Sequence, residues 1–97
     1  MVAFDKARYR EIFKQMGHAD DNGEALLLRT QLLKAVKNEL QKKNWTQERA
    51  AKELEVKRPR ISEIYALKID KFGVELLVKF LYRLKKEVTV QIKNARR

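Results

Sequence analysis

The chain has 97 residues, 44% of them hydrophobic and 37% charged, which predicts one folded domain rather than a disordered chain. It contains no Cys and one His, which excludes a disulfide framework, a thiolate metal site and a His-centred catalytic triad. Its formal net charge of +10 favours an anionic polymer, an anionic membrane surface or an acidic protein as partner, with a merely solubilising surface as the alternative.

The first predicted element is a helix over residues 4–16. The apolar side chains that share one face of this helix are Tyr9, Ile12, Phe13 and Met16. Asp5 is placed to cap the helix and Gly17 to end it, and residues 17–23 have the composition of a turn-rich linker. Residues 1–23 carry four basic and four acidic side chains, so this segment does not resemble a nucleic-acid-binding arm.

The longest predicted helix covers residues 24–43. Its apolar stripe consists of Leu28, Leu32, Leu33, Val36 and Leu40. Asn44 and Trp45 interrupt this pattern. We expect Trp45 to cover the core rather than to stack on a nucleic-acid base.

A pair of short helices follows. Thr46, with an amide and a carboxylate in the two residues after it, is a typical N-terminal cap, and the first short helix runs to Leu54. Pro59 is tolerated only in the first turn of a helix. The second short helix is therefore predicted to begin at Lys57 or Arg58.

The spacing of these two helices meets the packing demands of a helix-turn-helix. Ala51 is small enough for the helices to cross closely. The apolar side chains placed to fill the angle between the helices and to seat the second one are Leu54, Val56, Ile61 and Ile64. Glu55 departs from the pattern, because many such motifs place Gly there to reach a positive φ. An ordinary helical hairpin is the alternative.

Two more elements are predicted after the connection that contains Phe72, which we expect to be anchored in the core. Residues 74–85 form an amphipathic helix whose inward side chains are Leu77, Phe80, Leu81 and Leu84. Residues 87–93 alternate between polar and apolar types, as in a half-buried β-strand. One strand cannot satisfy its own backbone hydrogen bonds. It must pair with a symmetry mate in a homodimer or with the chain's own N-terminal segment.

Residues 46–64 resemble the helix-turn-helix of the XRE (Cro/repressor-like) family. Residues 56–64, followed by the sequence KIDKF at residues 68–72, are similar to the HigA-type antitoxin branch. That branch has a Pro-Arg-hydrophobe-Ser-acid recognition helix, a long leucine-rich helix before it and a short strand at the end. Lys57 and Arg58 depart from the residues usual in the branch, so the operator sequence cannot be carried over.

This resemblance, which covers residues 24–93, implies an all-α fold: a lambda-repressor-like helix-turn-helix bundle of about five helices with a short C-terminal β-strand. We divide the chain into an N-terminal helix and linker, residues 1–23, and a DNA-binding domain with its C-terminal strand, residues 24–97. The resemblance also implies an antitoxin that represses its own operon and pairs with a ribonuclease-type toxin.

Candidate DNA contacts follow from the geometry of the second short helix, whose core-facing residues leave the opposite face for a major groove. The side chains expected to read base edges are Arg58, Arg60, Ser62 and Glu63. The side chains expected to contact phosphates are Thr46, Gln47 and Lys57. The alternatives are a solvated cap charge for each Arg and, for Glu63, an ion pair with Arg60 or Lys57.

The sequence therefore predicts a transcriptional regulator that binds double-stranded operator DNA as a homodimer in the cytoplasm. The alternative is a protein-interaction module that neutralises a toxin, with the aromatic helix of residues 4–16 as its surface. We expect neither enzymatic activity nor a cofactor, because no candidate nucleophile, set of metal ligands or Gly-rich loop is present. RNA binding is disfavoured, because the chain lacks an aromatic platform on which bases could stack. No apolar run approaches the roughly 18 residues of a membrane span, and no signal-peptide pattern opens the chain.

Overall fold

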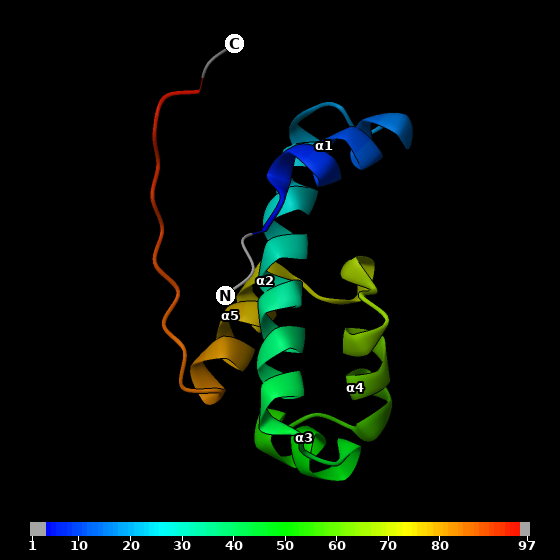
Figure 1. Cartoon of the computed structure of the whole chain (residues 1–97), viewed down its shortest axis with the longest axis vertical. Helices are drawn as coiled ribbons and strands as arrows, with labels where there is room; N and C mark the ends of the chain where they lie inside the picture. Colours follow the sequence, from blue (N-terminus) through cyan, green and yellow to red (C-terminus); the bar gives the residue numbers. More distant parts are fainter. Residues whose placement is uncertain (1–3, 96–97) are drawn as a thin grey trace.

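The computed structural model describes residues 4–95, which form five α-helices and one 3-10 helix (Figure 1). These elements are α1 (Lys6–Gln15), α2 (Asp21–Lys43), α3 (Gln47–Leu54), α4 (Arg58–Tyr65), η1 (Ile69–Lys71) and α5 (Val74–Arg83). The expected all-helical bundle is thus confirmed for this part of the chain. None of its helices is long and apolar enough to cross a bilayer.

The long helix α2 is the axis of the molecule, whose extents are 44 × 26 × 23 Å. Figure 1 shows α1 at one end of α2 and α3 at the other, with α4 and α5 on either side of the half of α2 that adjoins α3. The α3–α4 pair and α1 therefore occupy opposite ends of the molecule.

The main core lies between the C-terminal half of α2 and helices α3, α4 and α5. The side chains that the sequence placed in this core and that are buried there are Ala50, Ala51, Leu54, Ile61, Ile64, Phe72, Leu77, Phe80, Leu81 and Leu84. The rings of Phe72 and Phe80 meet edge to face, with centroids 6.2 Å apart, a favoured arrangement of aromatic quadrupoles. This contact anchors the chain between α4 and α5.

Trp45 covers the rim of this core, as expected, at the connection between α2 and α3. Its indole lies between two cations, with Lys43 Nζ 5.6 Å and the Arg49 guanidinium carbon 5.0 Å from the ring centroid. Both cations are close enough for attraction to the face of the ring.

Helix α1 packs on the N-terminal half of α2, outside the main core. Phe13 is its buried residue, and Tyr9 stacks on Phe4 with ring centroids 5.0 Å apart. Lys34 of α2 donates a hydrogen bond from Nζ to the Tyr9 hydroxyl at 3.1 Å. The aromatic residues of this segment thus serve mainly to attach α1 to α2.

The predicted apolar faces of these two helices are partly wrong. Ile12 and Met16 of α1 and Leu28 of α2 are exposed, and Leu27 is buried in place of Leu28. The reason is that α1 covers one strip of α2, and no other described element packs on this end of the molecule. The result is that these three apolar side chains are exposed at the end of the molecule far from α3.

Gly17 ends α1 as expected. Its φ of 89° is in the left-handed region, and the His18 N–H donates to the Phe13 carbonyl at 2.7 Å, which closes a Schellman-type turn.

Helix α2 begins at Asp21, whereas the sequence indicated a start at Glu24 and a linker through residue 23. The Asp20 side chain caps this earlier start by accepting from the backbone N–H groups of Asn22 and Gly23. Gly23 is buried against the His18 carbonyl, so closely that a Cβ at this position would overlap it. The apparent linker glycine therefore permits a close helix contact.

The prediction of a β-strand over residues 87–93 is wrong for the isolated chain. Figure 1 shows this segment, orange to red, extended beside the helices, and no strand is found within residues 4–95. Val88 packs against the core, but Val90 is 80% and Ile92 91% exposed. The alternating pattern is present, yet a strand also needs a neighbour to complete its backbone hydrogen bonds.

Candidate nucleic-acid interface

Helices α3 and α4 are joined by three residues, 55–57, as a helix-turn-helix requires. Thr46 caps α3, and its hydroxyl accepts from the Arg49 N–H at 3.1 Å. Glu55 then adopts φ 56° and ψ 45°, and the Val56 N–H donates to the Ala51 carbonyl at 2.9 Å. The turn therefore has the left-handed conformation usually assigned to Gly, although its residue is Glu.

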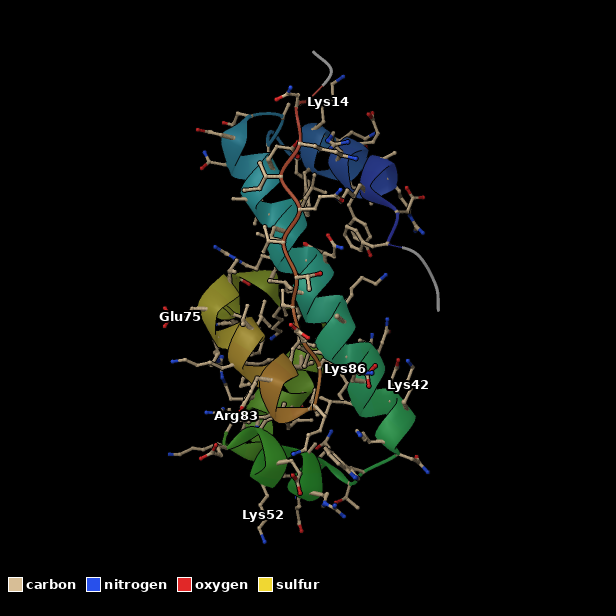
Figure 2. The ribbon with its side chains drawn as sticks, turned by 90° about the vertical axis from the view of Figure 1, so that its left-hand side faces the viewer. Lys14, Lys42, Lys52, Glu75, Arg83 and Lys86 are labelled. Carbon is tan, nitrogen blue, oxygen red and sulfur yellow. The ribbon has the colours of Figure 1, made fainter. Side chains whose placement is uncertain are left out.

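A side chain from α5 stabilises this turn. Arg83 donates from Nη1 to the Leu54 carbonyl at 2.8 Å, and its Nε lies 3.1 Å from Oε2 of Glu55. Figure 2 shows Arg83 on the end of α5 that adjoins α3. Leu54 is the last residue of α3, so the guanidinium satisfies a carbonyl that the helix leaves without a partner. It also pairs with the carboxylate of the left-handed residue.

Helix α4 has an apolar face that packs against the core and an opposite face that is exposed. Ile61 and Ile64 are fully buried against α3 and α2, whereas Pro59, Ser62 and Ala66 are exposed. This places α4 as a short helix held on one side, with a free side at the surface.

An open depression lies where α3 and α4 meet. It encloses about 520 Å³ and is lined by Gln47, Arg58, Pro59, Ser62, Glu63 and Lys68. It brings together four of the predicted contact residues, namely Gln47, Arg58, Ser62 and Glu63. The other three predicted residues, Thr46, Lys57 and Arg60, do not line it.

Arg58 is loosely held at the mouth of this depression. Its Nε lies 3.4 Å from Oε1 of Gln47, and its Nη1 lies 3.5 Å from Oε1 of Glu48. The side chains of Arg58 and Glu48 are 62% and 81% exposed, and an ion pair this exposed contributes about 0–1 kcal/mol. Arg58 can therefore leave these partners at little cost.

Arg60 is held much more firmly, on the flank of α4. Its Nη1 lies 3.2 Å from Oε1 of Glu63, and its Nη2 donates to the Lys71 carbonyl at 3.2 Å. Its guanidinium carbon is 4.3 Å from the centroid of the Phe72 ring. Arg60 and Glu63 are 30% and 23% exposed, so both are partly withdrawn from solvent.

Thr46 and Lys57 lie beside the depression at the starts of the two helices. Thr46 is the N-cap of α3 and Lys57 the N-cap of α4, and both are exposed. The Lys57 side chain makes no ion pair within residues 4–95.

Lys68 is a lining residue that the sequence reasoning missed. It follows Leu67, which has a φ of 52°, and the Lys68 N–H donates to the Glu63 carbonyl at 3.1 Å. This left-handed turn at the end of α4 brings Lys68 back beside Ser62 and Glu63. Lys68 begins the KIDKF sequence, but nothing in the sequence indicates a positive φ at a leucine.

Residues 4–95 contain no group of three or more His, Asp or Glu side chains that could hold a metal ion.

A comparison with known families matches residues 13–93 to a family described as a helix-turn-helix domain. No curated protein and no solved structure matches the chain. The matched segment includes α2 to α5 and the end of α1, and therefore both helices that line the depression. The chain belongs to this family of helix-turn-helix domains, whose fold implies DNA binding and is typically not enzymatic.

Proposed function

We propose that this chain is a sequence-specific transcriptional regulator of the XRE type, with α4 as its recognition helix. The observation that carries the proposal is the depression between α3 and α4. There Arg58 and Ser62, on the exposed side of a helix seated by apolar residues, lie together with Gln47 from the start of α3. A formal net charge of +10 supplies the attraction to phosphates that operator binding needs. In this proposal the protein acts in the cytoplasm, on the nucleoid.

The residues divide into two kinds of contact. Arg58 can pair bidentately with guanine, and Ser62, one turn further along α4, can reach a neighbouring base edge. Thr46, Gln47 and Lys57 contact phosphates, because backbone N–H groups at a helix start and a nearby ammonium both favour anions. The Thr46 hydroxyl accepts from the Arg49 N–H and so keeps its own proton to donate.

Selection from a pool of random duplexes tests the proposal. The full chain should enrich one motif, and Arg58→Ala should weaken binding to it by about 1–3 kcal/mol while binding to a scrambled duplex changes little. Lys14→Ala is the matched control, because Lys14 is an exposed cation at the opposite end of the molecule (Figure 2). Enrichment of no motif, or equal losses for the two variants, would contradict sequence-specific binding.

We also propose that the regulator is a homodimer on a palindromic operator. The support is the extended segment of residues 87–95, where Val90 and Ile92 are exposed and no backbone hydrogen bond is made to any of residues 4–95. The residue just before this segment contacts α2, because Lys86 Nζ lies 3.4 Å from Oε1 of Glu39. A second copy of the segment would supply the missing backbone partner.

A second candidate role is toxin neutralisation, with autorepression of the toxin operon. The observation in its favour is that three apolar side chains, Ile12, Met16 and Leu28, are exposed at the end of the molecule away from α3. Such side chains can anchor a partner protein while the DNA-facing surface stays free.

Co-expression with the product of the neighbouring gene tests this role. The double variant Ile12→Ser with Met16→Ser should lose neutralisation and keep operator binding, because neither residue is buried. Full protection by this variant would leave α1 with a structural role alone. Leu27→Ser is the contrasting variant, since Leu27 is buried and its loss should unfold the α1–α2 contact.

A further inference from the structure

Arg60 makes more intramolecular contacts than any other base-reading candidate on α4. One guanidinium nitrogen pairs with Glu63 one turn along the helix, and another donates to the Lys71 carbonyl in η1. The guanidinium carbon lies 4.3 Å from the centroid of the Phe72 ring, close enough for a cation–π contact. Phe72 is itself buried, so Arg60 connects the first turn of α4 to the core residue that anchors the chain before α5.

Glu63 gives this arrangement a consequence for DNA. It is the one carboxylate that lines the depression at the α3–α4 junction. An unpaired carboxylate at this place would face the phosphates of a bound duplex and weaken its binding. The Arg60 guanidinium, 3.2 Å from Glu63, neutralises it.

We infer that Arg60 and Glu63 are positioning residues, which fix α4 on Phe72 and cancel a charge within the interface, and that the base contacts come from Arg58 and Ser62. This inference rests on the proposed DNA-binding function and reassigns two of the residues that the sequence placed among the base readers. For Arg60 to reach a base it would have to release three partners and leave Glu63 unpaired in a partly buried site, which is costly. Arg58 has only exposed partners to release.

Unfolding without DNA tests the positioning role. Arg60→Ala should raise the unfolding equilibrium constant of the full chain roughly tenfold, whereas Arg58→Ala should change it by less than about twofold. Arg60→Lys keeps the charge but cannot hold Glu63, the Lys71 carbonyl and the ring together, so it should lie between the two and remains measurable if Arg60→Ala does not fold. Equal stability of Arg60→Ala and Arg58→Ala would overturn the positioning role.

A second-site substitution separates positioning from base reading. Arg60→Ala should weaken binding to the enriched duplex and to a scrambled duplex alike, and Glu63→Gln added to it should restore most of the loss. The selected motif should be that of the unchanged chain. The matched control is Arg58→Ala with Glu48→Gln, the other Arg–Glu pair of the interface. In this control, Glu48→Gln should restore none of the lost binding affinity, because Arg58→Ala has removed a base contact.

Two outcomes would overturn the inference. One is that the motif selected by Arg60→Ala loses its base preference at one position, and the other is that adding Glu63→Gln restores none of the lost binding affinity. If the unchanged chain enriches no motif, the proposed function fails and the base-reading half of the inference fails with it. The unfolding comparison then still decides whether Arg60 positions α4, so the two failures are distinguishable.

Discussion

At the residue scale, the turn of the helix-turn-helix shows how a side chain from a distant helix can offset an unfavourable backbone conformation. Glu55 has a φ of 56°, which costs a non-glycine residue roughly 1–2 kcal/mol. The carboxylate recovers part of this cost by pairing with Arg83 at 3.1 Å. Arg83 in turn satisfies the Leu54 carbonyl, and that bond does not depend on Glu55.

These contacts predict opposite effects for the two partners. Glu55→Gly should be neutral or stabilise the protein by up to about 1 kcal/mol, because it removes the strain and only an exposed ion pair. Arg83→Ala should destabilise it by about 1.5–3 kcal/mol, because a helix-end carbonyl loses a charged donor. Urea unfolding of both variants measures this difference. A destabilising Glu55→Gly would mean that the ion pair outweighs the backbone strain.

Gly23 gives a second residue-scale prediction. Gly23→Ala should destabilise the protein by about 1–3 kcal/mol, because its Cβ would overlap the His18 carbonyl and force the α1–α2 turn to shift. Gly73→Ala is the control, since a Cβ at Gly73 meets no atom within 4 Å. Thermal unfolding compares the two, and similar losses would show that the close contact at Gly23 yields easily.

At the scale of elements, the helices were predictable and several of their ends were not. Amphipathic spacing located α1 to α5, and Thr46 and Pro59 marked the starts of α3 and α4 correctly. Within residues 4–95, four non-glycine residues adopt a positive φ after helices: Asn44, Glu55, Leu67 and Lys85. The sequence analysis pointed to this conformation only at position 55, where related motifs place Gly. The start of α2 was missed because Gly23 was interpreted as part of a linker.

The sequence named four of the residues that line the depression, and it gave the Arg60–Glu63 ion pair only as an alternative to base reading. Gln47, Arg58 and Ser62 do share one depression, whereas Arg60 contacts Lys71 of η1 and Phe72, eleven and twelve residues further along the chain. Periodicity assigns a face to a helix, but a long flexible side chain can reach partners on a neighbouring element. Lys68 was missed for a related reason, since its position depends on the left-handed conformation of Leu67.

Lys68 supplies the prediction for this element. Lys68→Ala should weaken binding to all duplexes alike and reduce the slope of log affinity against log salt by roughly one unit, as expected for the loss of one phosphate contact. Lys14→Ala, at the far end of the molecule, should leave the slope unchanged. Titrations at several salt concentrations measure this, and a loss confined to the enriched motif would instead make Lys68 a base contact.

At the scale of the whole molecule, the extended segment of residues 87–95 has no backbone hydrogen-bond partner within residues 4–95. Its alternation was recognised in the sequence, but whether it forms a strand depends on a neighbour that a single chain does not contain. The main core closes around α2, and Val88 is the residue of this segment that packs at its edge.

This arrangement predicts the assembly. The full chain should sediment as a dimer at tens of micromolar, and Val90→Asp with Ile92→Asp should shift it to a monomer that remains folded, because both side chains are exposed. In the dimer two α4 helices should lie ~34 Å apart, one turn of DNA. The variant should also bind its palindromic operator far more weakly than the unchanged chain. A monomeric unchanged chain, with and without DNA, would contradict this assembly.

The two cations near the Trp45 indole, at the α2–α3 connection, have a consequence for the fluorescence of the protein. Trp45 is the only tryptophan in the chain, so intrinsic emission excited at the red edge comes from this one ring. It immediately precedes Thr46 and Gln47, and the Arg49 guanidinium lies 5.0 Å from its centroid. Cations near an indole alter its quantum yield. A duplex that draws Arg49 or Lys43 toward its phosphates would therefore change the brightness of the protein, so that binding can be followed without any label.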